Sequence, residues 1–196
     1  VLEKCEYSGG SVDLREICRK ISVDLKFSDE TKKDGYGRII LGSANFDRRS
    51  IEINAHGNDD RRRFTLAHEI GHFCLRHDRY LRSESVVAND LFIDGTSEGG
   101  FNYERLEFQA NAFASNLLLP DQFFRLKVAD RRRALEIRDR GHGYIFVDDQ
   151  PCNYWPYTQL LSGLSSDFEA SKTAVEIKLT NMGLLTDQRR VGKSPF

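Results

Sequence analysis

The segment His68-Glu69-Ile70-Gly71-His72 is the feature that most limits what this chain can fold into. It lies within residues 61–77, where apolar residues recur at helical spacing and predict a helix. Two histidines four residues apart share one helical face, so both imidazoles can reach a single ion. Glu69 lies about 100° around the helix from His68, where it can contact a water at that ion without being a ligand. The pattern predicts a helical metal site.

Two histidines do not complete a catalytic zinc site, which needs a third protein ligand and an open position for water. A second helix is predicted from about Asn102 to Leu118, ended by Pro120. Glu107 lies beside its apolar stripe, where a half-buried carboxylate needs a cation or a hydrogen-bond partner. Glu104, one turn earlier, competes for the ligand role, and Asn111, one turn later, could brace a ligand through a hydrogen bond. Spacing alone leaves both glutamates open.

The remaining pattern predicts an α+β fold with a small antiparallel sheet. Alternating apolar residues and intervening turn residues predict three strands, at Val23–Phe27, Gly37–Leu41 and Ser50–Asn54. A short helix is expected at Ser11–Lys20, capped by Ser11. Between Arg79 and Gly100 no regular pattern is recognisable, and this stretch ends in a loop at residues 94–100. The predicted core stripes of the two long helices are Phe64, Ala67, Ile70, Phe73 and Cys74, and Leu106, Ala110, Phe113 and Leu117.

Composition excludes several classes of protein. The 29 Lys and Arg residues nearly balance the 30 Asp and Glu residues, so no overall field holds this chain to nucleic acid or to an acidic membrane. No apolar run approaches the roughly 18 residues of a membrane helix. The four cysteines are scattered and form no C-x-x-C pair, which favours a reduced, cytoplasmic protein over a disulfide scaffold.

The two helical motifs resemble those of the ImmA/IrrE family of metallo-endopeptidases. The resemblance rests on R-R-R-F-T-L-A-H-E-I-G-H-F-C-L-R-H (61–77) and E-F-Q-A-N-A-F-A-S-N-L-L-L-P (107–120), within an order of elements that extends over roughly residues 11 to 128. The family's second motif more often ends in L-L-M-P, whereas this chain has leucine at position 119. Leucine and methionine have similar volumes, so the difference does not affect the chemistry.

The resemblance implies a zincin-like fold, in which a small sheet lies beside an active-site helix and a second helix delivers a glutamate. It implies that His68, His72 and Glu107 are the metal ligands and that Glu69 is the catalytic base. The resemblance, rather than the spacing, thus selects Glu107 over Glu104. The expected cofactor is Zn²⁺, with Mn²⁺ as the alternative.

Several finer features of the site are expected from this assignment. A further group should stabilise the oxyanion, and the sequence does not rank Tyr103, His142 and Tyr154 for this role. Gly71, which lacks a side chain, lets a neighbouring element or the substrate approach the helix closely. By analogy with other zincins, the strand Ser50–Asn54 is expected to bind extended substrate by edge pairing.

Three segments are expected along the chain: a zincin-like metallopeptidase domain at 1–128, a charged connecting segment at 129–156, and a helical C-terminal segment at 157–196. A strand is expected at Tyr144–Val147. Two short helices are expected in the tail, joined near residues 169–171. In family terms this tail is similar to half of a helix-turn-helix. Its basic residues Lys172, Lys178, Arg189 and Arg190 are offset by Asp167, Glu169 and Glu176, so DNA binding is not favoured.

The resemblance also implies a substrate: family members act on, or pair with, small helix-turn-helix repressors or antitoxins that regulate stress responses or mobile elements. Two other functions remain open at this level. The protein could bind such a partner without cleaving it, as a sequestering module or as the toxin of a toxin–antitoxin pair. It could also be a DNA-binding regulator that uses its C-terminal helices, which the near-neutral charge disfavours.

Overall fold

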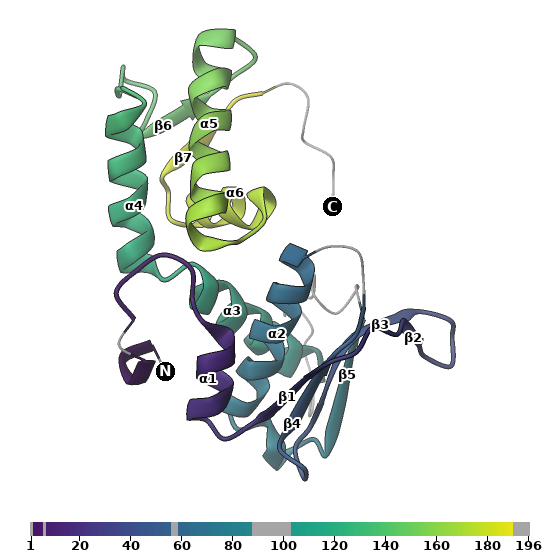
Figure 1. Ribbon diagram of the computed structural model, residues 1–196. Coiled ribbons are helices and arrows are strands. Elements are labelled where there is room, and N and C mark those ends of the chain that lie inside the picture. The colour runs from purple at the N-terminus through teal and green to yellow at the C-terminus, as the bar shows by residue number, and fades with distance from the viewer. Residues whose placement is uncertain (1, 6, 56–58, 88–102, 190–196) are drawn as a thin grey trace. The chain divides into compact units, whose positions relative to one another are not determined.

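The computed structural model describes residues 2–5, 7–55, 59–87 and 103–189, and the chain divides into two compact units, Val1–Leu118 and Leu119–Phe196. The elements of the first unit are η1 (Leu2–Cys5), α1 (Leu14–Lys20), β1 (Asp24–Phe27), β2 (Lys32–Lys33), β3 (Ile39–Asn45), β4 (Ser50–Ile53), α2 (Asp59–Cys74), η2 (His77–Arg79), β5 (Ser83–Val87) and α3 (Tyr103–Leu118) (Figure 1). Those of the second are α4 (Asp121–Ala134), β6 (Ile145–Val147), α5 (Pro151–Phe168), α6 (Lys172–Asn181) and β7 (Leu185–Asp187). The predicted α+β class is confirmed, while the expected loop at 94–100 and the predicted first residue of the second long helix, Asn102, lie outside the described residues.

The sheet of the first unit is mixed. Strand β3 pairs antiparallel with β2, β4 and β5, as the prediction of an antiparallel sheet requires. That prediction is wrong for β1 and β4, which pair in parallel with Asp24 opposite Ser50 and Phe27 opposite Ile53. A parallel pair needs a long crossover connection, and the segment containing β2 and β3 supplies it. Because β4 lies between β1 and β3, both of its edges are paired, and the expected pairing of substrate with this strand is also wrong.

Strand β5 lies in the stretch where no regular pattern was recognisable. Its side chains do alternate, since Glu84 and Val86 are buried while Ser83 and Ser85 are exposed. Glu84 is opposite Ala44, a buried residue of β3, and directly opposed residues of a sheet point to the same face. A glutamate therefore occupies a position on the buried face where a hydrophobic residue is usual, which disguised the strand.

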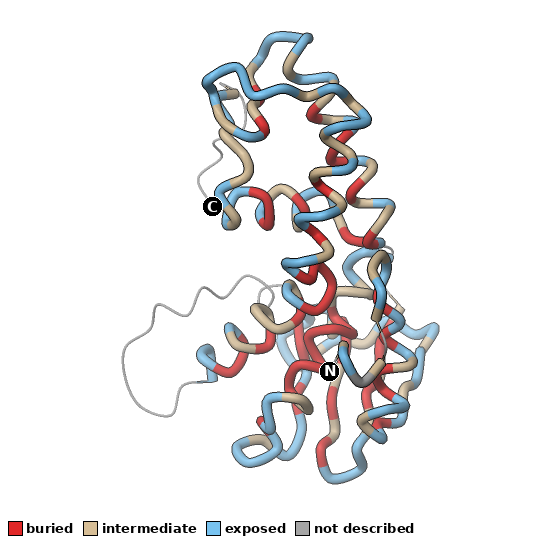
Figure 2. Tube along the Cα trace, turned by 90° about the vertical axis from the view of Figure 1, so that its left-hand side faces the viewer, coloured by how far each residue is buried: buried red, intermediate tan, exposed pale blue. Residues whose placement is uncertain are grey.

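Helix α2 lies between the sheet and α3, and its residues 65–72 are all buried (Figures 1 and 2). A helix with neighbours on both sides is buried all round instead of along one stripe. Helix α2 starts at Asp59 and ends at Cys74, before the predicted end at His77. Arg76 adopts a left-handed backbone conformation with φ of 63°, which no continuing α-helix allows, and His77 begins the short helix η2.

Close approach on both sides of α2 depends on two glycines. A Cβ atom added to Gly42 of β3 would lie 2.8 Å from Thr65 Cγ2, so the sheet could not approach the helix as it does. On the other side, a Cβ atom added to Gly71 would lie 3.1 Å from Phe113 Cδ1 and 3.3 Å from the carbonyl oxygen of Ala110. The expectation that Gly71 admits a neighbouring element is thereby confirmed, and the neighbour is α3.

Replacing Gly71 with alanine is expected to destabilise the protein by about 1–2 kcal/mol, measured by chemical denaturation. Overpacking of this kind costs about 1–3 kcal/mol, and the better helix propensity of alanine offsets up to about 1 kcal/mol. The obstructing oxygen of Ala110 belongs to the backbone and cannot turn aside as a flexible side chain could. Gly35, which has nothing within 4 Å of an added Cβ atom, provides the control Gly35→Ala. Equal unfolding free energies for the two variants would contradict the tight packing.

The second unit has its own core, made by α4, α5 and α6 beside the parallel pair β6–β7. The rings of Phe124 and Phe168 lie 5.6 Å apart in this core, and both are fully buried. Helix α4 continues through residue 128, where the sequence placed the end of the first domain. Helices α5 and α6 meet at residues 169–171, and the Ser171 side chain caps α6 by accepting a hydrogen bond from the Ala174 amide.

Several basic side chains of the second unit take part in ion pairs. Arg131 donates two hydrogen bonds to Asp167, with N–O distances of 2.7 and 2.9 Å. The buried ammonium of Lys178 pairs with the carboxylate of Asp121, and Arg189 pairs with acidic neighbours on α6 and β7. The charges of these three cations are therefore neutralised within the unit. No helix in the described part of the chain has the length and apolar character needed to cross a membrane.

Candidate metal centre

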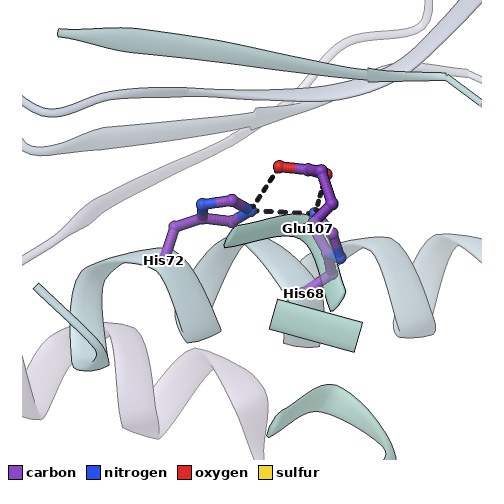
Figure 3. A group of neighbouring side chains, drawn as sticks. All are labelled: His68, His72 and Glu107. Atoms are coloured by element: carbon purple, nitrogen blue, oxygen red, sulfur yellow. Dashed lines mark hydrogen bonds and ion pairs between the residues drawn. The ribbon is translucent and has the colours of Figure 1, made fainter. Parts of the chain in front are cut away.

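His68, His72 and Glu107 come together in the first unit. The Nε2 atoms of His68 and His72 lie 3.0 Å apart. Nε2 of His68 lies 3.2 Å from one carboxylate oxygen of Glu107, and Nε2 of His72 lies 3.4 Å from the other. All three side chains are fully buried. Figure 3 shows the Glu107 carboxylate directed at both rings. Within the described residues, these three form the one histidine, cysteine and carboxylate group that could hold a metal ion.

Secondary structure positions these ligand atoms. One turn of α2 separates His68 from His72, which places both rings on one face, as predicted. Helix α3 packs against α2 and brings Glu107 to that face. Asn111, one turn further along α3, accepts a hydrogen bond from Nδ1 of His68 at 2.8 Å. This bond leaves the His68 Nε2 lone pair directed toward the cluster, as a metal ligand requires.

The dimensions of the cluster fit a small divalent ion. Zinc–nitrogen bonds of 2.0–2.1 Å in tetrahedral geometry place neighbouring ligand atoms about 3.3 Å apart. The three distances among the ligand atoms, 3.0, 3.2 and 3.4 Å, lie close to that value. Two neutral imidazoles and one carboxylate are also a usual donor set for zinc. Burial, followed by the charges of His68 and His77, lowers the pKa of His72 well below its ordinary value, which favours the neutral form that binds metal.

Glu69 has a buried carboxylate with no hydrogen-bond partner in the described part of the chain. The residue is fully buried, and within the described residues this lack of a partner applies to both of its oxygens. Burial raises its pKa well above the ordinary value, and the charges of Glu84 and Glu107 raise it further. A buried carboxylate without partners is costly, and a water and a nearby cation would satisfy it. The observation fits an ion held by the neighbouring cluster.

Glu84 is a further acidic residue beside the cluster that sequence reasoning missed. It is 4% exposed and accepts a hydrogen bond from the hydroxyl of Tyr103. Burial, and next the charge of Glu107, raise its pKa from the ordinary value of 4.5 to about 8. The charge of His68 also influences this pKa, so Glu84 borders the same site. No local motif marks the residue, because it reaches the site only through the pairing of β5 with β3.

Two side chains beyond the ligands extend the cluster on the side of His72. His77 lies against His72, and Gln109 of α3 lies against His77. Sequence reasoning missed both, and the five-residue spacing between His72 and His77 was the only available signal. Glu104, the competing ligand candidate, is exposed and lies outside the group that could hold a metal. Of the three candidates for the oxyanion-binding group, Tyr103 belongs to the first unit, whereas His142 and Tyr154 belong to the second.

The fold and the cluster define a class. Two histidines of an H-E-x-x-H helix, joined by a glutamate from the next helix and accompanied by a buried glutamate, form a candidate site of the kind that zincin-type metallopeptidases use. The model of the IrrE N-terminal-like domain, the peptidase M78 family, matches residues 18–180. The chain therefore belongs to this family of metallopeptidases, and the resemblance drawn from its motifs is confirmed. Comparison with curated proteins found no match.

Proposed function

We propose that this protein is a zinc-dependent endopeptidase in which His68, His72 and Glu107 bind the metal and Glu69 is the catalytic base. The observation that carries the proposal is the triangle of ligand atoms, 3.0–3.4 Å on a side, beside the fully buried and unpartnered carboxylate of Glu69. Elsewhere in the described residues no comparable group of potential ligands occurs.

The chemistry divides between the ion and the chain. A divalent ion, when bound, supplies a Lewis acid that polarises the scissile carbonyl and lowers the pKa of the attacking water. Glu69 accepts the proton of that water and later passes it to the departing amine. Its raised pKa suits the first step, because a carboxylate whose pKa is raised by burial takes up a proton more readily than an ordinary one. Burial of the ligands excludes bulk water and strengthens these electrostatic interactions.

Tyr103 is the group that we assign to stabilise the oxyanion. Its hydroxyl donates to Glu84, which in turn borders Glu107 and His68, and it would donate to the oxyanion in place of Glu84 when substrate binds. Tyr103 also lies one helical turn before Glu107 on α3, which places both residues on the same side of that helix. With its ring 39% exposed, Tyr103 connects the buried cluster with the surface from which a substrate would enter.

We assign the substrate to the class of small helix-turn-helix repressors or antitoxins, so that cleavage would regulate gene expression. Membership of the IrrE-type peptidase family supports a protein substrate. The test is to incubate the zinc-loaded protein with the repressor encoded beside it and to follow intact masses over time. Fragments are expected with zinc and not after chelation. Persistence of the intact repressor under both conditions would overturn this substrate assignment while leaving the metal site untouched.

A further inference from the structure

We propose that His77 and Gln109 form a hydrogen-bonded relay that fixes the tautomer and the orientation of His72 as a metal ligand. The inference rests on the proposed function, because it takes His72 Nε2 as the atom that binds the ion. It assigns positioning roles to two residues outside the ligand set, so it can fail while the metal site itself stands.

The contacts run in one line away from the ligand cluster. Nδ1 of His72 lies 3.0 Å from Nδ1 of His77, and Nε2 of His77 lies 3.2 Å from Oε1 of Gln109. The two imidazole rings are nearly perpendicular, at 79°, with their centroids 4.9 Å apart. Both ring nitrogens of His77 are therefore engaged in hydrogen bonds. His77 contacts Nδ1 of His72, away from the Nε2 atom that binds the ion, so His77 supports a metal ligand without being one.

The Gln109 oxygen sets the direction of the protons along this line. A carbonyl oxygen accepts only, so Nε2 of His77 carries a hydrogen and donates it to Gln109. In neutral His77 the other nitrogen, Nδ1, is then an acceptor, and Nδ1 of His72 must donate to it. Neutral His72 consequently has no hydrogen on Nε2, and its lone pair there points toward Glu107 and His68. The reverse direction would place a hydrogen on Nε2 of His72 and block metal binding.

Local backbone geometry makes this arrangement possible. Helix α2 stops at Cys74, and the left-handed conformation of Arg76, with φ of 63°, turns the chain so that His77 folds back beside His72. His77 is only 2% exposed, so its two ring nitrogens need partners within the protein.

Helix α3 then supports both imidazoles as well as supplying the third ligand. Glu107 completes the cluster, Asn111 accepts from His68, and Gln109 acts on His72 through His77. Each histidine ligand thus donates a hydrogen bond from its second ring nitrogen to an acceptor within the first unit. Such outer partners typically change metal affinity by about 10–100-fold.

The experiment measures zinc affinity by competition with a chromogenic chelator, in the full-length protein. We expect His77→Phe and Gln109→Leu each to weaken zinc binding by about 10–100-fold. Two conservative variants should retain most of the affinity: His77→Asn offers an amide oxygen near the place of Nδ1, and Gln109→Glu keeps an acceptor for Nε2. Asn116→Leu removes an exposed amide of the same helix and is expected to leave zinc affinity unchanged.

Two readouts separate positioning from packing. Thermal unfolding of the metal-free variants reports folding, and the half-buried Gln109 provides a test even if His77→Phe does not fold. Nitrogen-15 NMR of the zinc-loaded wild type should show His77 with its hydrogen on Nε2. A hydrogen on Nδ1, or unchanged zinc affinity in Gln109→Leu, would overturn the relay. Failure of the wild type to bind zinc would instead overturn the proposed function. His68→Ala, which lacks one ligand, is the reference for a protein without zinc.

Discussion

Replacing Glu69 with glutamine is expected to leave zinc bound and to lower the rate of peptide cleavage by about 100-fold to 10,000-fold. A positioned general base contributes a factor of this size, and the amide of glutamine cannot accept the proton of the attacking water. Glutamine has nearly the same volume as glutamate, so the fully buried position can accommodate it without a cavity. The measurements are zinc content by elemental analysis and the initial rate of repressor cleavage.

Metal retention is expected because Glu69 lies outside the ligand triangle. The residues that could hold the metal are His68, His72 and Glu107, whereas neither carboxylate oxygen of Glu69 has a hydrogen-bond partner in the described part of the chain. The neutral amide also removes a carboxyl whose charged form is disfavoured, because burial and then the charges of Glu84 and Glu107 raise the pKa of Glu69. The folded protein should therefore tolerate the substitution or gain stability from it.

The matched variant is His68→Ala, which is expected to lose both zinc and cleavage because it removes a ligand. The pair of variants distinguishes catalysis from binding alone. If the protein acted only by sequestering a partner, Glu69→Gln would behave like the wild type in every assay of partner function. Full proteolytic activity in Glu69→Gln would exclude Glu69 as the base.

The parts of the site that the sequence predicted are those fixed by short-range geometry. His68 and His72 share a helical face because of their spacing, and Asn111 follows Glu107 by one turn. These positions within a helix do not depend on what the helix packs against. The choice of Glu107 over Glu104 needed the family resemblance, because both lie on the same helix. In the structure the choice follows from burial, since Glu107 faces α2 while Glu104 is exposed.

The parts that were missed depend on contacts between distant segments. Glu84 reaches the site only because β5 pairs with β3, a relation between residues about forty positions apart for which no local pattern exists. The parallel pairing of β1 with β4 depends in the same way on a crossover. His77 depends on the left-handed conformation of Arg76, and a non-glycine residue in that conformation carries no sequence signal.

The stability of the metal-free protein is expected to fall as the pH rises from 6.5 to about 8, and zinc is expected to reverse this trend. In the folded state the pKa of Glu84 is raised from 4.5 to about 8, so the folded chain keeps a proton that the unfolded chain has released. Stability therefore decreases with pH throughout this window. The lowered pKa of His72 acts in the opposite sense, but only below 6.5, where an unfolded histidine becomes protonated.

Zinc changes the sign because it binds deprotonated ligands, and its stabilisation therefore grows with pH. At a free concentration about 1,000 times the dissociation constant, a ligand specific for the folded state adds about 4 kcal/mol to the unfolding free energy. Denaturant titrations at pH 6.5, 7.2 and 8.0, with zinc and with chelator, measure both trends. Glu84→Gln should make the decline of the metal-free protein shallower without abolishing it, because burial also raises the pKa of Glu69 well above its ordinary value. Glu104→Gln, which changes an exposed residue of α3, should leave the decline as it is. If the stability of the metal-free protein is level or rises across this range, Glu84 is not held protonated beside Glu107. The interpretation that acidic side chains lie close together around an ion site would then be contradicted.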